Sequence, residues 1–216
     1  MKPAVDDVLA NSANLNDDTK GKAEFFDNKM KSLGFPPITY AIQRGLSLNQ
    51  FVQNMFLLYM AMNDAAIVTW SNKFQYDTVR PFSLAGPGLG TLSNLPAPDW
   101  RSYLNTDQHP DYPSLSACFC AAQMEAMRLF YKTDNFGYSY QWMAGSSTVE
   151  PGLTPKTTLT LGPWPTFTAF ENDCALSCVQ AGVHFREAAF AGLTLCRPVA
   201  DAAYNKLTQI LQGQSD

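Results

Sequence analysis

The sequence carries little charge and no surplus of basic residues. Charged side chains make up 16% of the 216 positions, and the net charge is −4. Domains that bind nucleic acid usually carry a basic patch, so this balance argues against that class. Hydrophobic residues reach 46%, which is typical of an ordered globular chain that is long enough to bury one sizeable core.

Residues that bind metals or form disulfides are also few. The chain has two histidines, five cysteines and no Cys-x-x-Cys pair. An odd cysteine count without such a pair does not predict a zinc site. The opening segment Met1–Asp7 lacks the apolar core of a secretory signal, so we expect reduced thiols rather than disulfides, and the localisation stays undetermined. The cysteines are Cys118, Cys120, Cys174, Cys178 and Cys196.

One stretch, Phe51 to Trp70, is apolar enough to raise the question of a membrane span. It contains Gln53, Asn54 and Asp64, which are costly inside a bilayer. We therefore expect a buried helix of a water-soluble domain rather than a membrane span.

Signals for helix starts recur, whereas strand-like alternation is scarce. Ser47-x-x-Gln50 is a capping box, and it predicts a long helix through Trp70. Ser114 or Ser116 is a suitable N-cap for another helix. Further helices are predicted from Asp17-Asp18 to Leu33 before Gly34 and Pro36-Pro37, from Thr168-x-x-Glu171 through His184 to Phe190, and from Pro198 in a first turn through Leu211.

Two long connections separate these helices. Residues 75–113 include the Gly86–Gly90 run and several prolines, and residues 133–165 are rich in aromatic side chains. Long loops in a compact domain are usually functional, and the aromatic content predicts that they are ordered. We therefore predict one all-α domain over residues 1–216, in which residues 1–46 form a helical extension and the loops are rich in proline and glycine.

Four polar residues are candidates for chemistry, although each has a simpler explanation. Lys73 and Arg80 suit an anion but also suit a solvated surface. Ser114 at a helix start, where free amides favour anions, also serves as an ordinary N-cap. His184 within a helix is more often a packed structural residue than a catalyst. None of these residues predicts a function by itself.

Their order and spacing carry more information. Lys73-x6-Arg80-Pro81 is followed by Pro113-Ser114 and then by Ser177-x6-His184. This order resembles the superfamily of vanadium-dependent haloperoxidases and type-2 phosphatidic acid phosphatases. The residues that resemble the haloperoxidase branch are Asp64-Ala-Ala-Ile-Val-Thr-Trp70, His109-Pro-Asp-Tyr-Pro113 and Gly182-Val-His184-Phe-Arg186. The resemblance covers about residues 50–205 and implies a helical bundle of that type.

The resemblance also implies a role for each retained residue. Lys73, Arg80 and Ser114 match family residues that bind an oxoanion, either vanadate or phosphate. His184 matches the axial vanadium ligand of haloperoxidases and the nucleophile of phosphatases. Its ring must be neutral to offer a nitrogen lone pair for either role.

Three positions depart from the family pattern. Leu115 replaces a glycine that allows close backbone approach, Ser116 replaces the acid–base histidine, and Cys178 replaces an arginine. The lost arginine predicts oxoanion binding weaker by roughly a hundredfold or more. The lost histidine predicts turnover slower by about 10²–10⁴-fold, unless His109 enters from its loop as a substitute.

Three functions remain open from the sequence. The first is a haloperoxidase-like protein with a degenerate oxoanion pocket, weakly active or inactive toward hydrogen peroxide and halide. The second is a non-catalytic domain that needs no cofactor and contacts protein partners or copies of itself. The third is a soluble phosphatase that forms a phosphohistidine. Whether the chain is an enzyme is left undecided at this stage.

Overall fold

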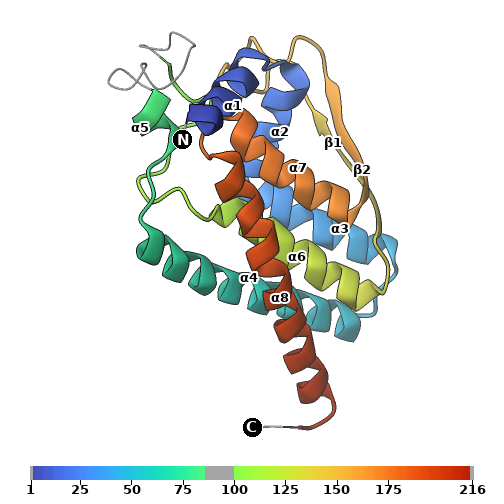
Figure 1. Cartoon of the computed structure of the whole chain (residues 1–216). Helices are drawn as coiled ribbons and strands as arrows, with labels where there is room; N and C mark the ends of the chain where they lie inside the picture. Colours follow the sequence, from blue (N-terminus) through green and yellow to red (C-terminus); the bar gives the residue numbers. More distant parts are fainter. Residues whose placement is uncertain (1, 86–99, 215–216) are drawn as a thin grey trace.

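The structure is a computed structural model that describes residues 2–85 and 100–214 (Figure 1). The predicted all-α class is confirmed, because helices form nearly all of its regular structure. The Gly86–Gly90 run lies outside the described residues. The elements are α1 (Lys2–Ala13), α2 (Asp17–Asp27), the π-helical turn η1 (Met30–Gly34), α3 (Phe35–Gln43), α4 (Leu48–Tyr76), α5 (Pro81–Ala85), α6 (Leu115–Tyr131), β1 (Asn135–Trp142), β2 (Leu159–Thr166), α7 (Phe167–Gln180) and α8 (Arg186–Leu211).

Helix α6 lies at the centre of the bundle and packs against α4, α7 and α8 (Figure 1). Helix α8 approaches the start of α6 very closely. A Cβ atom added to Gly192 of α8 would lie 2.7 Å from the carbonyl oxygen of Ser114, so a larger residue does not fit there. The backbone N–H of Ser114 donates to the carbonyl of Ala188 at 2.9 Å. These contacts fix the position at which α6 begins.

Two predicted helix starts are confirmed. Ser47 and Gln50 form the reciprocal capping box at the start of α4. The helix continues beyond Trp70 to Tyr76, so Lys73 lies in its last turn. Ser114 is the N-cap of α6, and its hydroxyl accepts from the N–H of Ala117 at 3.3 Å.

The predicted helix boundaries near the N-terminus were wrong. Asn16 caps α2, and this helix ends at Asp27 rather than at Leu33. Pro36 and Pro37 lie in the first turn of α3, where a missing N–H leaves no hydrogen bond unmade. The prolines therefore begin a helix instead of ending one.

The C-terminal helices also differ from the prediction. Thr166, not Thr168, caps α7. Gly182 has a φ of 78°, a left-handed conformation that ends the helix, so residues 181–185 separate α7 from α8 and His184 is not helical. Pro198 lies inside α8 rather than in a first turn. A proline there loses one helical hydrogen bond, and packing of α8 on its neighbours offsets that loss.

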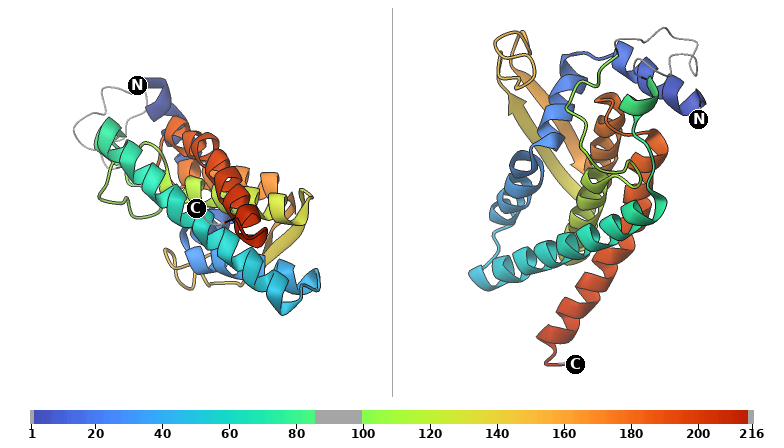
Figure 2. Two further views of the ribbon diagram at one scale, coloured as in Figure 1. Left: turned by 90° about the horizontal axis from the view of Figure 1, so that it is seen from below. Right: turned by 90° about the vertical axis from the view of Figure 1, so that its left-hand side faces the viewer.

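Strands β1 and β2 form an antiparallel ribbon that the sequence analysis did not predict. The ribbon runs along one side of the helices (Figure 2). Its Trp164 is fully buried and stacks on Phe25 of α2, with ring centroids 5.2 Å apart. Phe170 of α7 meets both rings edge to face. This aromatic cluster attaches the N-terminal helices to α7.

The expectation of reduced thiols was wrong. Four cysteines are paired, as Cys118–Cys196 between α6 and α8 and as Cys120–Cys174 between α6 and α7. Cys178 is free and buried. The sequence cannot show this, because each pair joins residues that are brought together only by helix packing, 78 and 54 positions apart.

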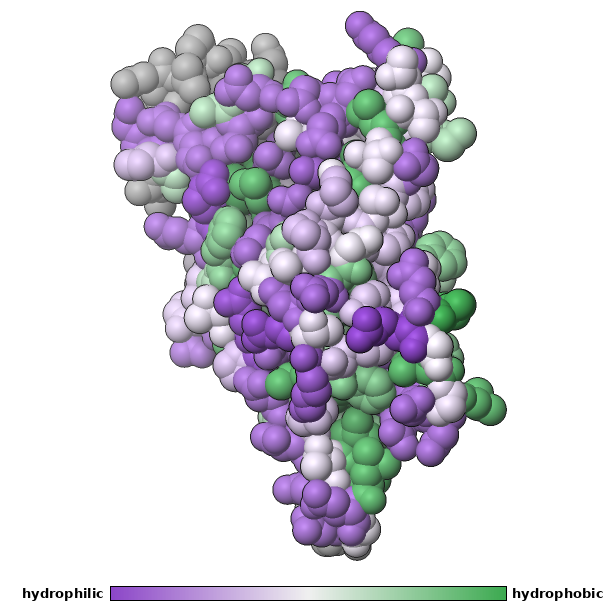
Figure 3. All heavy atoms as spheres, turned by 90° about the vertical axis from the view of Figure 1, so that its right-hand side faces the viewer, coloured by the Kyte–Doolittle hydropathy of each residue, from purple (hydrophilic) through white to green (hydrophobic). Residues whose placement is uncertain are grey.

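Helix α4 buries only one face, whereas the sequence analysis predicted a buried helix. By length and composition, α4 is apolar enough to cross a membrane, and 28% of its most apolar window is buried inside the molecule. Figure 3 shows apolar surface in the lower part of the molecule, toward the end of α8. The exposed apolar residues of α4 are Leu48, Val52, Phe56, Tyr59, Ile67, Phe74 and Tyr76.

Candidate functional site

His184 lies in the break between α7 and α8 and is 3% exposed. Its Nδ1 lies 2.7 Å from Oδ1 of Asp111, and its Nε2 lies 3.5 Å from Nη1 of Arg80. Burial lowers the pKa of His184, although the hydrogen bond to Asp111 raises it. A neutral ring beside a carboxylate carries its proton on Nδ1, so Nε2 keeps its lone pair.

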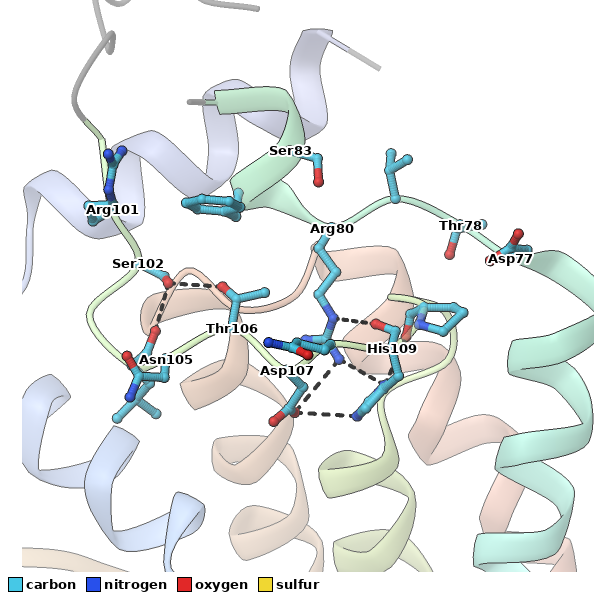
Figure 4. Close-up of a pocket in the computed structure, with 15 residues that line it drawn as sticks. Asp77, Thr78, Arg80, Ser83, Arg101, Ser102, Asn105, Thr106, Asp107 and His109 are labelled. Atoms are coloured by element: carbon cyan, nitrogen blue, oxygen red, sulfur yellow. Dashed lines mark hydrogen bonds and ion pairs between the residues drawn. The ribbon is translucent and has the colours of Figure 1, made fainter. Parts of the chain in front are cut away.

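Arg80 contacts both histidines of the chain, and Figure 4 shows its contact with His109. Its Nε donates to the carbonyl of His109 at 2.8 Å, and its Nη1 donates to the carbonyl of Val183 at 2.8 Å. Its Nη2 lies 3.1 Å from Nδ1 of His109 and 3.7 Å from the carboxylate of Asp107. The guanidinium is thus fixed by the backbone on both sides and stays beside Nε2 of His184.

Lys73 is fully buried behind these groups. Its ammonium donates to the carbonyls of Pro110 and Asp111, so it holds the segment that carries the partner of His184. Burial and the charge of Arg80 lower the pKa of Lys73 to about 8, although the charges of Asp111 and Asp107 raise it. Lys73 does not line the cavity beside His184, and its effect there is electrostatic.

A small cavity of about 30 Å³ lies beside His184. Ser116 and Cys178 line it together with Lys29 and Asp107. Burial raises the pKa of Cys178, so this thiol stays protonated and supplies no charge. Two of the three substituted positions, Ser116 and Cys178, therefore lie at the same cavity as His184.

Ser114 and Leu115 are not among the described residues that line this cavity. The hydroxyl of Ser114 caps α6 and lies 3.8 Å from Sγ of Cys178. Ser114 therefore acts as a helix cap in this structure.

A larger cleft of about 1070 Å³ adjoins the cavity (Figure 4). Arg80 and His109 line the cleft, and Asp107 lines both the cleft and the cavity. The Asp107 side chain is 65% exposed, and its carboxylate lies 3.4 Å from Nε2 of His109. Burial lowers the pKa of His109, so its ring is neutral near neutral pH. His109 thus lines the cleft as a neutral base, and its Nδ1 contacts Arg80.

The sequence analysis missed two residues of this site. Asp111 stands in the quoted His109-Pro-Asp-Tyr-Pro113 segment, and a lone carboxylate near a histidine motif was a usable signal. Lys29 gave no such signal, because it comes from the junction of α2 and η1, 87 positions before Ser116. Only the fold brings Lys29 to the cavity.

The donors at the cavity fit an oxoanion better than a metal cation. Within residues 2–85 and 100–214, no group of three His, Cys, Asp or Glu side chains is placed to hold a metal ion. The cavity is lined by His184, by the hydroxyl of Ser116 and by the ammonium of Lys29, together with the carboxylates of Asp27 and Asp107. The guanidinium of Arg80 lies beside Nε2 of His184. Such donors suit the oxygens of vanadate or phosphate, and the histidine nitrogen suits the central atom.

Comparisons with known proteins agree with this geometry. Residues 53–213 match the family model described as the VCPO second helical-bundle domain. The holo form of a bacterial vanadium-dependent chloroperoxidase has a TM-score of 0.87 and 30% identity, over 96% of this chain and 47% of that one. The apo form gives 0.90 and 30%, over 99% and 50%.

A bacterial vanadium-dependent iodoperoxidase shares the fold, with a TM-score of 0.71 and 19% identity, over 94% of this chain and 48% of that one. Among the curated proteins, none matches the chain. This chain spans about half the length of the chloroperoxidases that it matches.

Proposed function

This chain belongs to the family of the VCPO second helical-bundle domain, and from that premise we propose that it binds vanadate and oxidises halide slowly with hydrogen peroxide. One observation carries the proposal. Buried His184 is tied to Asp111 through Nδ1 and directs Nε2 toward Arg80 at a small cavity. This arrangement prepares a neutral nitrogen ligand beside a fixed positive charge.

Each residue of the site would have its own role in binding vanadate. His184 would hold the vanadium atom through Nε2, and Arg80 and Lys73 would balance the negative charge of the oxygens. Asp111 fixes the tautomer and orientation of His184. Bound vanadate supplies a Lewis-acid centre that activates peroxide toward halide. In the overall reaction, two electrons pass from halide to hydrogen peroxide and one proton is consumed, which gives hypohalous acid and water.

Slow turnover follows from Ser116. A serine hydroxyl does not exchange protons near neutral pH as the family histidine does, and the loss of such a group typically costs about 10²–10⁴-fold in rate. His109 is neutral and lies in the adjoining cleft, 3.1 Å from Arg80. It is therefore the residue best placed to take up and release protons there.

Other functions are less well supported. The same donors suit phosphate, but the matched structures at 30% identity are vanadium-dependent chloroperoxidases, which favours vanadate. A non-catalytic role would apply if the chain bound no oxoanion. Vanadate binding therefore separates the proposal from that alternative.

The test is an assay of the purified chain with vanadate, bromide and hydrogen peroxide. We expect vanadate to bind in calorimetry, and we expect a phenol dye to be brominated only when all three reagents are present. Omission of vanadate, with equimolar phosphate in its place, is the control. If the chain binds no vanadate and brominates no dye above that control, the proposal is wrong and the non-catalytic role is favoured.

The charge of Lys73 predicts how oxoanion binding depends on pH. Below its pKa of about 8 the buried ammonium attracts an oxoanion, and above that pH it becomes neutral. The charged groups that face it are Arg80, Asp111 and Asp107. Between about pH 8 and about pH 10, where the charge of phosphate is nearly constant, we expect phosphate affinity to fall about tenfold or more.

Calorimetric titration with phosphate across this range measures the effect. The Lys73→Met variant is the comparison, because it lacks the titrating group. Its affinity should already be low at about pH 8 and should fall less above that pH than the affinity of wild type. An equal decline in wild type and variant would show that another group is responsible.

A further inference from the structure

Lys29 is a charged residue at the cavity, and the family pattern supplies no role for it. It lies before residues 53–213, which the family model matches. Helix α2 ends at Asp27, and the π-helical turn η1 that follows directs the Lys29 side chain into the bundle. Its ammonium donates to the carbonyl of Phe26 at 2.7 Å and to the hydroxyl of Ser116 at 2.8 Å. The side chain thus ends at a substituted position.

The same ammonium lies beside the other substituted position. Lys29 and Cys178 line one cavity with His184, and the charge of Lys29 lowers the pKa of Cys178 in part, against the larger effect of burial. A family arginine at position 178 would have placed its charge in this region. The chain has therefore lost a cation on α7 and carries another that enters from the end of α2.

The hydrogen bonds of Lys29 leave its charge without a direct ion pair. Part of the residue is exposed, but burial of the ammonium lowers the pKa of Lys29. Both acceptors are neutral oxygens, and among the described residues no carboxylate forms a direct ion pair with the ammonium. The carboxylates of Asp27 and Asp107 line the same cavity, and their charges raise the pKa of Lys29 in part. A desolvated cation without a direct ion pair favours the binding of an anion nearby. Lys29 lines the cavity beside His184, where such an anion would lie.

We propose that Lys29 replaces the lost arginine as a cationic ligand of the oxoanion, and that it works through the hydroxyl of Ser116, which it orients toward the same cavity. The inference rests on the proposed oxoanion binding at His184. The hydroxyl oxygen of Ser116 accepts a hydrogen bond from Lys29, so its own O–H is free to donate to an oxoanion oxygen. Ser116 and Lys29 together thus provide a second side of the pocket that carries charge and donates hydrogen bonds.

The test compares phosphate affinity by calorimetry in matched variants of the full chain. Lys29→Gln keeps a hydrogen-bond donor but removes the charge, and we expect it to weaken phosphate binding about 10–100-fold. Lys29→Arg should stay within several-fold of wild type. Lys31→Gln is the control, since Lys31 lies two positions away over the ring of Tyr140. Thermal unfolding of each variant reports whether the fold is kept.

A second-site variant separates charge from structure. Cys178→Arg returns a cation to α7, so the pair Lys29→Gln with Cys178→Arg should recover most of the lost phosphate affinity. A merely structural role of Lys29 predicts no such recovery. Wild-type binding with equal affinity in Lys29→Gln and Lys31→Gln would overturn this inference alone. No phosphate or vanadate binding by wild type would overturn it together with the proposed function.

Discussion

Replacement of His184 by glutamine is expected to abolish vanadate-dependent bromination and to weaken vanadate binding by at least about 100-fold. A residue that hydrogen-bonds a metal ligand typically contributes about 10–100-fold to the affinity for the metal, so the ligand itself contributes more. Glutamine still offers an N–H to Asp111, which is 2% exposed and would otherwise be left as a buried unpaired charge. Calorimetry with vanadate and the dye assay measure the two effects.

Phosphate provides the control for this variant. Hydrogen bonds and charge hold phosphate reversibly, so its affinity should fall far less than that of vanadate. Retained bromination in His184→Gln would show that the vanadium ligand is a different residue. Equal losses for phosphate and vanadate would show that the substitution damages the whole pocket.

Asp111→Asn should weaken vanadate binding as well, but less than His184→Gln does. Asparagine can still accept from Nδ1 of His184, but it lacks the negative charge that makes the ring a stronger ligand. We expect vanadate affinity to fall about 10–100-fold while the fold is kept. Asp201→Asn, an exposed change on α8, is the matched control. No difference between the two variants would mean that Asp111 does not tune His184.

Removal of the disulfide Cys118–Cys196 is expected to lower the free energy of unfolding by about 4 kcal/mol. The bond closes a loop of 78 positions, and a loop of that length restricts the unfolded chain strongly. The double variant Cys118→Ser with Cys196→Ser should therefore unfold at a much lower urea concentration than wild type, with a similar slope. Urea unfolding followed by circular dichroism measures the change.

The free cysteine gives the control for the disulfide variant. Cys178→Ser removes a buried thiol without opening a loop and should cost about 1 kcal/mol or less. In denaturant without a reducing agent, wild type should show one reactive thiol among its five cysteines. Five reactive thiols in freshly purified protein would contradict both the pairing and the expected loss of stability.

Local signals predicted the parts of the fold and site that local chemistry determines. Ser47 and Ser114 cap helices because a hydroxyl there satisfies free N–H groups, wherever the helix packs. The spacing of Lys73, Arg80 and His184 identified the family, which the comparison over residues 53–213 supports. Their roles as oxoanion ligands remain predictions, to be tested by the variants above.

The features that the sequence analysis missed depend on tertiary contacts. Gly182 breaks the predicted helix because its backbone is left-handed and lies against Trp100, where a Cβ atom would come within 2.8 Å. Pro198 fits within α8 because packing outweighs local preference. Lys29 reaches Ser116 only after α2 has packed on α7. No window of neighbouring residues contains that information.

The disulfides have a consequence for recognition as well as for folding. Cys120–Cys174 joins α6 and α7 about one turn from Ser116 and Cys178, and Cys118–Cys196 joins α6 to α8 nearby. The walls of the cavity are thus held at fixed separations before any anion arrives. A preorganised pocket loses little conformational entropy when it is filled. The two disulfides therefore offset part of the oxoanion affinity that is lost through the replacements at positions 115, 116 and 178.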